Sequence, residues 1–136
     1  AMTGHQGNPV NGITLQHRES RELDLPGLVR ALGVEDVAVV NPMDLKATRA
    51  ALKAAAQNAD ELSVIIFCSP CVLLSKTHDP ALVVSHDCRA CGACTLIGCP
   101  AISRDEDGKA HIDANLCVGC EQCSQTCAFG CIGKAE

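Results

Sequence analysis

The chain has 136 residues and a formal net charge of −5; eleven residues are cysteine, and only Phe67 and Phe129 are aromatic. Cysteine makes up about 8% of the chain, far above ordinary usage, so cysteine chemistry is expected to stabilise a molecule whose aromatic-poor core would be weak. The negative charge argues against a nucleic-acid partner, because phosphate binding needs a basic face.

The sequence also argues against a membrane location. The longest apolar run, Val64–Cys68, is far too short to span a bilayer. The N-terminus carries no charged segment followed by an apolar one, as a secretion signal would. We therefore expect a soluble, cytoplasmic protein.

The chain opens with a Gly-rich, polar segment, Met2–Pro9, whose composition is typical of a flexible loop. Residues 1–22 are expected to be mobile, or ordered only by contact with another chain. A helix is predicted next over Asp24–Leu32, ended by Gly33.

Residues 34–69 predict one βαβ unit. Asp36–Val40 and Leu62–Cys68 are short apolar runs, typical of strands that are buried on both faces. Two parallel strands leave the edges and faces of a sheet uncovered, so other chains or further residues should complete it. This part of the chain is therefore expected to be a partial α/β domain.

A helix is predicted between these two strands. Asn41 is the predicted N-cap, with Pro42 at the first helical position and Asp44 in the first turn. The Ala-rich run that follows continues the helix to about Asn58.

The distribution of cysteines indicates a domain boundary. Residues 1–80 hold only Cys68 and Cys71, whereas residues 81–136 hold the other nine. Ser75–Pro80 is rich enough in turn-forming residues to carry the boundary, which gives domains 1–80 and 81–136. The fold class expected for the whole chain is α+β.

The nine C-terminal cysteines include two copies of one motif. The first reads Cys88-x2-Cys91-x2-Cys94-x4-Cys99-Pro100 and the second Cys117-x2-Cys120-x2-Cys123-x3-Cys127-Ala128. The first and the third cysteines of the two copies are each 29 residues apart. Two copies of one structural unit are the simplest explanation.

This spacing points to iron–sulfur chemistry. Three cysteines at i, i+3 and i+6 can surround three corners of a cubane, while the fourth is carried away by a following helix and can ligate the cluster of the other copy. This crossed pattern is that of two-cluster bacterial ferredoxins, which residues 81–136 resemble closely. The predicted ligands are Cys88, Cys91, Cys94 and Cys127 for one [4Fe–4S] cluster and Cys117, Cys120, Cys123 and Cys99 for the other.

Zinc and disulfide bonds are the alternatives. Structural zinc usually takes two separated cysteine pairs, whereas this chain has two triplets. Disulfides need an oxidising compartment, which nothing in the sequence indicates, and the total number of cysteines is odd.

The linker between the two motifs predicts a hairpin. Asp107-Gly108 is a strong tight-turn sequence, and Ile102 and Ile112 flank it. A further strand, Ala81–Ser85, is expected to enter the first cysteine loop.

Other candidate residues have two interpretations each. The Cys68-x2-Cys71 pair resembles a redox motif, but we expect both side chains to be small buried hydrophobes, because the pair ends a strand instead of beginning a helix. Cys131 is expected to pack against a cluster, and His86 to tune one through a hydrogen bond or its charge. The remaining polar candidates are expected to be solvated loop residues: His17, His78, His111 and Asp105–Asp107.

One family combines all of these features. Thr3-Gly4-His5-Gln6 followed by a proline, then a helix, a βαβ unit ending in Pro70-Cys71, and two cluster motifs resembles the C-terminal end of the large subunit of indolepyruvate:ferredoxin oxidoreductases, which are thiamine-dependent 2-oxoacid oxidoreductases. The resemblance implies that Thr3, Gly4, His5 and Gln6 lie near thiamine diphosphate and its Mg²⁺. The Mg²⁺ ligands of the family would lie upstream, so the chain is expected to be a fragment, or the product of a truncated or split gene, and inactive alone.

The resemblance also implies partners and a reaction. The partners would be the remainder of the large subunit, the small subunit and an external ferredoxin. The intact enzyme would decarboxylate an aryl 2-oxoacid oxidatively to an acyl-CoA, with the clusters receiving the electrons. A stand-alone ferredoxin-type carrier with an N-terminal docking domain is the alternative, and structural or sensory clusters are a third hypothesis.

Overall fold

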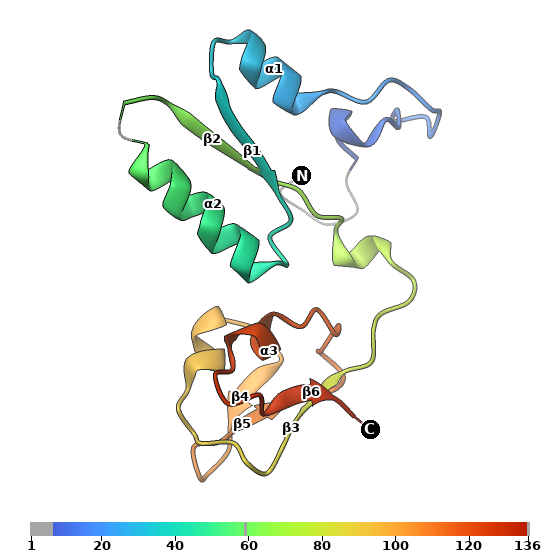
Figure 1. The fold of residues 1–136 in the computed structure, drawn as a ribbon. Coiled ribbons are helices and arrows are strands. Elements are labelled where there is room, and N and C mark those ends of the chain that lie inside the picture. The colour runs from blue at the N-terminus through green and yellow to red at the C-terminus, as the bar shows by residue number, and fades with distance from the viewer. Residues whose placement is uncertain (1–6, 59, 136) are drawn as a thin grey trace. The chain divides into compact units, whose positions relative to one another are not determined.

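The computed structural model of the chain describes residues 7–58 and 60–135, and its fold class is α+β, as predicted (Figure 1). It divides into two compact units, Ala1–Ser75 and Lys76–Glu136. Among the described residues, no helix is long and apolar enough to cross a membrane.

The described part of the N-terminal unit begins with a short 3-10 helix, η1 (Pro9–Asn11), and an isolated bridge between Ile13 and Glu19. The predicted mobility of residues 1–22 stays a prediction. Helix α1 (Leu25–Ala31) follows, as expected, and Asp24 caps it through a hydrogen bond from the N–H of Gly27 (2.9 Å). Gly33 adopts a left-handed conformation (φ 92°) just beyond the helix, where a side chain would be strained.

The predicted βαβ unit is confirmed. Strands β1 (Asp36–Val40) and β2 (Ser63–Phe67) pair in parallel, with Asp36 opposite Ser63 and Val40 opposite Phe67. Helix α2 (Leu45–Gln57) connects them (Figure 1). A second 3-10 helix, η2 (Val72–Leu74), ends the unit.

The predicted N-cap of α2 is wrong: Asp44, not Asn41, caps the helix. The side chain of Asp44 accepts a hydrogen bond from the N–H of Ala47 (2.9 Å), and Asp44 has an extended backbone that cannot belong to a helical turn. Asn41 instead begins a separate turn. Its side chain accepts from the N–H of Met43 (3.0 Å), and its carbonyl accepts from the N–H of Asp44 (3.1 Å).

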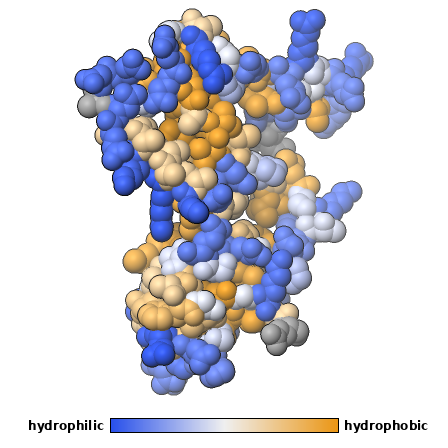
Figure 2. Space-filling view, in the orientation of Figure 1, coloured by the Kyte–Doolittle hydropathy of each residue, from blue (hydrophilic) through white to orange (hydrophobic). Residues whose placement is uncertain are grey.

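The strands of this unit are not buried on both faces, contrary to the prediction from their apolar sequences. Val39 is 54% exposed and Phe67 47% exposed. Apolar side chains accordingly lie at the surface of the N-terminal unit in Figure 2. The physical reason is the small size of the sheet, since two strands and two helices leave part of each strand without a covering layer.

The C-terminal unit is built from two small antiparallel sheets. Strand β3 (Leu82–Val84) pairs with β6 (Ile132–Lys134), and β4 (Ile102–Arg104) pairs with β5 (Ala110–Ile112). The first pair brings together the two ends of the unit. The second pair is the predicted hairpin, and Gly108 occupies its turn at φ 77°.

The C-terminal unit also contains two short helices. All six buried apolar side chains of the described residues lie in the C-terminal unit. The helices are η3 (Ala93–Ile97), a 3-10 helix, and α3 (Gln122–Thr126). The centre of the core combines Leu82 and Ile132, from the paired strands, with Cys94 and Cys123, from the helices.

Candidate metal centre

The third cysteine of each motif lies in the core of the C-terminal unit. Cys94 is in η3 and Cys123 is in α3, and they are 7% and 8% exposed. Both belong to one apolar cluster with Leu82 and Ile132. Equivalent positions of the two motifs are therefore buried together, although 29 residues separate them in the sequence.

The two cysteine loops have the same backbone course. In each loop, the residue before the second cysteine has a positive φ: 52° at Ala90 and 70° at Gly119. The residue after the second cysteine also has a positive φ, 74° at Gly92 and 61° at Glu121, and begins the short helix. This repeated left-handed turn folds each triplet back on itself, with Cys91 and Cys120 both exposed.

The structure brings Cys127 to the first triplet. The predicted first set of ligands (Cys88, Cys91, Cys94 and Cys127) lines one hollow. Cys131, Phe129 and Ile132 complete the wall on the side of Cys127. We call these four cysteines and their hollow the first site.

A hydrogen bond orients Cys127 within the first site. Its Sγ accepts the backbone N–H of Cys131 at 3.3 Å. Burial acts to raise the pKa of Cys127, but this bond and further backbone N–H groups at Phe129 and Gly130 outweigh it, so the pKa lies below the usual range. A hydrogen bond to the sulfur favours the thiolate, which is the form that binds metals.

The buried cysteines show the opposite shift. Burial raises the pKa of Cys94, and neighbouring Cys88, Cys127 and Cys91 raise it further. Burial likewise raises the pKa of Cys123, with a smaller contribution from Cys120. Several thiolates this close repel one another, so all of them ionise together only around a positively charged centre.

The donor set fits a centre of several atoms. Among the described residues, no group of three or more His, Cys, Asp and Glu side chains is arranged to hold a single metal ion. Four cysteines around one hollow, with sulfur as their only donor atom, are instead the donor set that iron–sulfur clusters use. The first site therefore fits an iron–sulfur centre by its chemistry.

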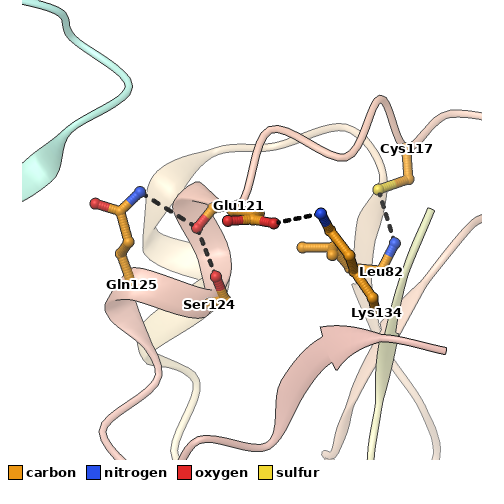
Figure 3. Close-up of polar contacts among 6 residues, drawn as sticks. All are labelled: Leu82, Cys117, Glu121, Ser124, Gln125 and Lys134. Carbon is orange, nitrogen blue, oxygen red and sulfur yellow. Dashed lines mark hydrogen bonds and ion pairs between the residues drawn. The ribbon is translucent and has the colours of Figure 1, made fainter. Parts of the chain in front are cut away.

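The second triplet, Cys117, Cys120 and Cys123, lies in the loop of the second motif. The backbone N–H of Leu82 donates to the Sγ of Cys117 at 3.5 Å (Figure 3). Cys99 is half-buried just after η3, where its carbonyl accepts the N–H of Ile102 at 3.1 Å. We call Cys117, Cys120, Cys123 and Cys99 the second site, and the membership of Cys99 stays a prediction.

The other cysteines occupy different environments. Cys131 is buried (5% exposed) in the wall of the first site, where its thiol lies 3.6 Å from the carbonyl of Phe129. Cys68 is exposed, so the prediction that it is a buried hydrophobe is wrong, and Cys71 is half-buried. Cys68 follows the end of β2, beyond the part of the sheet that packing covers.

The histidines at positions 17, 78, 86 and 111, which the structure describes, are exposed to solvent. His86 pairs with Asp87 (3.2 Å), and its tuning role stays a prediction. His111 lies in β5, not in a loop as predicted, but its side chain points away from the core. His17 and His78 lie in exposed loop segments, as does the acidic turn Asp105–Asp107. The predicted thiamine loop, Thr3–Gln6, lies outside the described residues.

Sequence reasoning missed the charged groups around the two loops. Arg89 lies over the ring of Phe129, 6.0 Å from its centroid, and lines the first site. Glu121, beside Cys120, forms an ion pair of 3.2 Å with Lys134 (Figure 3). Alignment of the two motifs would have revealed one signal, because Arg89 occupies the position of Val118.

Known proteins of one kind are similar to this chain. It is 35% identical over 146 residues to the indolepyruvate oxidoreductase subunit IorA of Pyrococcus horikoshii, a match that covers 100% of this chain and 22% of that subunit. The same subunit of Methanothermobacter thermautotrophicus is 38% identical over 138 residues, covering 97% of this chain and 22% of the relative. The same subunit of Thermococcus kodakarensis is 35% identical over 139 residues, covering 95% and 21%.

The chain thus spans about a fifth of the length of these curated relatives, and it matches their C-terminal part. No protein-family model and no solved structure matches it.

Proposed function

Since this chain is a homologue of the C-terminal part of the indolepyruvate oxidoreductase subunit IorA, we propose that it transfers electrons through two [4Fe–4S] clusters in an oxidoreductase of that kind. The observation that carries the proposal is the first site, where Cys127 from the second motif joins Cys88, Cys91 and Cys94 around one hollow. Such an exchange of the fourth ligand is what a two-cluster bacterial ferredoxin domain requires.

The described residues supply what such clusters need. When bound, the clusters would accept and release electrons one at a time. The core side chains around Cys94 and Cys123 exclude water from one side of each site. The N–H groups of Cys131 and Leu82 donate to ligand sulfurs, which stabilises negative charge there. Exposed Cys91 and Cys120 leave an edge of each site open to an electron partner.

The wider enzyme completes the proposal. Electrons would come from the oxidative decarboxylation of an aryl 2-oxoacid to an acyl-CoA, with thiamine diphosphate and Mg²⁺ bound by the remainder of the large subunit. Thr3–Gln6 would lie near that cofactor. The small subunit and an external ferredoxin are the proposed partners, and the N-terminal βαβ unit would be part of the thiamine-binding domain.

A stand-alone ferredoxin-type carrier with an N-terminal docking domain is less well supported. The similarity to IorA subunits covers 95–100% of this chain in the three relatives, and so includes the N-terminal unit. The N-terminal unit thus has a counterpart in subunits of an oxidoreductase, which supports the first proposal.

The proposal is tested by analysis of the chain purified without oxygen. We expect a brown protein with about eight iron atoms and about eight acid-labile sulfides per chain, as two cubanes require. A matched preparation exposed to air and chelator should lose colour, iron and sulfide together. A colourless protein holding one or two zinc ions would contradict the proposal.

A further inference from the structure

We propose that the first site has the higher reduction potential of the two, because two arginines lie against its loop, whereas the second loop carries Val118 and Glu121 at the positions of Arg89 and Gly92. The inference rests on the proposed clusters. It assigns to Arg89 and Arg104 the role of raising the reduction potential of the first cluster, since both would act on that cluster through their charge. The order of the potentials sets the direction in which electrons move inside the unit.

Arg89 is the first of the two cations. It follows Cys88 directly and lines the hollow together with all four cysteines of the first site. Its guanidinium is held over Phe129, which lines the same hollow. Among the described residues, no carboxylate forms an ion pair with Arg89.

Arg104 is the second cation. A Cβ built on Gly92, between Cys91 and Cys94, would overlap the guanidinium of Arg104, so this group lies directly against the loop. Its Nη2 donates to the Oγ1 of Thr95 at 3.4 Å, which holds it beside η3. Glycine at position 92 thus serves two purposes: it allows a positive φ of 74°, and it leaves space for the cation.

The second loop carries Val118 and Glu121 at the positions that Arg89 and Gly92 occupy in the first. The backbone of Asp79 packs so closely on Gly119 that a Cβ there would lie 2.9 Å from its carbonyl carbon and oxygen. Glu121 follows Cys120, and its ion pair with Lys134 makes that pair neutral (Figure 3). Asp113 accepts the N–H of Cys117 on its backbone carbonyl at 3.0 Å and the N–H of Asn115 on its carboxylate at 2.8 Å.

The other charged groups near the first site are screened or paired. Asp87 contacts His86 at 3.2 Å, and the side chains of Asp87 and His86 are 69% and 92% exposed, so water screens both. Lys109 donates to the carbonyl of His86 at 2.9 Å, and Asp105 accepts the N–H of Lys109 at 2.8 Å, which keeps one cation and one anion together. The two arginines are the cations that lie against the first loop itself.

Other factors that set cluster potentials are matched between the two sites. Each has a buried third cysteine, an exposed second cysteine and a half-buried first cysteine. Backbone N–H groups donate to ligand sulfurs in both sites, from Cys131 to Cys127 at 3.3 Å and from Leu82 to Cys117 at 3.5 Å. Cluster potentials depend on net charge, hydrogen bonds to sulfur and solvent exposure, and the charged groups against the two loops differ.

The consequence is a defined electron path. A cluster gains negative charge when it is reduced, and nearby cations stabilise that charge. One electron would pass from the reduced second cluster to the oxidised first cluster, and no proton or bond change is needed. An electron should therefore reside mainly on the first site, beside Arg89 and the exposed Cys91.

The test is a redox titration of the iron-loaded chain with dithionite, followed by electron paramagnetic resonance. We expect two one-electron steps at different potentials. Arg89→Val gives the first loop the residue of the second, and it should lower the higher step while leaving the lower step in place. If the variant lowers the ratio of electrons on the first site to electrons on the second about tenfold, the two steps should move about 59 mV closer together.

Two further variants separate charge from packing. Arg89→Lys keeps the charge but loses the planar contact with Phe129, so it should retain the separation of the two steps. Arg104→Gln removes the second cation and should lower the same step as Arg89→Val. Raising the salt concentration of the wild-type sample should bring the two steps together, because salt screens exposed charges.

The outcomes distinguish this inference from the proposed function. Two steps at equal potentials, or a lower step that moves in Arg89→Val, would overturn the inference and leave the clusters in place. If Arg89→Val does not retain iron, Arg104→Gln and the salt series test whether cations raise the potential of the first site. A wild-type chain without iron would overturn the proposed clusters themselves.

Discussion

The backbone N–H of Cys131 donates a hydrogen bond to the Sγ of Cys127, over 3.3 Å. Cys127 ends helix α3, which also carries Cys123, yet its sulfur lines the hollow of the first site. Cys131 begins the turn into β6, and its carbonyl accepts the N–H of Ser85 at 2.8 Å, near Cys88. The two bonds connect the end of the second motif to the start of the first.

This connection makes crossed ligation testable. Cys127→Ser should remove or alter the cluster of Cys88, Cys91 and Cys94 and spare the other, so about four of eight iron atoms should be lost. Cys99→Ser should cause the complementary loss. Iron analysis and electron paramagnetic resonance of both variants provide the measurement.

The control for crossed ligation is Cys131→Ala. It keeps the backbone N–H that donates to Cys127, and it removes only a thiol that lies 3.6 Å from the carbonyl of Phe129. Iron content should therefore stay unchanged. Damage by Cys127→Ser to the cluster of Cys117, Cys120 and Cys123 would show that each motif binds its own cluster.

A second prediction concerns Gly119, which lies in the second loop at φ 70° against the backbone of Asp79. Gly119→Ala should cost the left-handed strain of about 1–2 kcal/mol and a further cost for displacing Asp79. Gly130→Ala is the matched control, since Gly130 has φ 65° but open space around its Cβ position, and it should cost the strain alone. Each 1 kcal/mol lowers Tm by about 4–8 °C in a domain of this size. Equal melting temperatures for the two variants would contradict the close approach.

A third prediction concerns the start of α2. Asp44→Ala should lower the free energy of unfolding by about 1 kcal/mol, because the N–H of Ala47 loses its capping carboxylate. Asn41→Ala should cost less, because Asn41 stabilises only the preceding turn. Hydrogen exchange of the first amides of α2 measures both variants. A larger loss of stability in Asn41→Ala than in Asp44→Ala would show that Asn41, not Asp44, caps the helix.

A fourth prediction concerns pH. Hydrogen bonds from the hydroxyl of Ser63 and, more weakly, the amide of Asn58 hold the pKa of Asp36 below its ordinary value. The carboxylate therefore stabilises the N-terminal unit above its unfolded pKa of about 3.8, and this contribution is lost as the pH falls through the lower folded pKa.

The variant Ser63→Ala should raise the pKa of Asp36 towards the ordinary value, whereas Ser63→Thr, which keeps a hydroxyl, should leave it low. The carbon resonance of the carboxyl group, followed by NMR across acid pH, gives the pKa directly. An unchanged pKa in Ser63→Ala would mean that the hydroxyl does not set it.

Local interactions made much of the fold predictable. The boundaries of β1 were predicted to the residue, and the hairpin of β4 and β5 followed from Asp107-Gly108. The N-cap of α2 was missed because Asn41 and Asp44 are both good caps, and only the backbone of Asp44 shows which one begins the helix. The exposure of Cys68 and Val39 was missed because a strand sequence does not reveal how many elements cover it.

The sequence by itself determined which cysteines form two equivalent loops, because their spacing follows from chain geometry within each motif. The motif also predicted that Cys127 lies with the first triplet, but only the tertiary structure shows how it gets there, through the pairing of β3 and β6 and the packing of Leu82 and Ile132, residues 50 apart in the chain. The same packing placed Arg104 on Gly92 and Asp79 on Gly119. Spacing is a local property and sets the kind of site, whereas a contact such as that of Arg104 with Gly92 joins residues that are apart in sequence and meet only when the core forms.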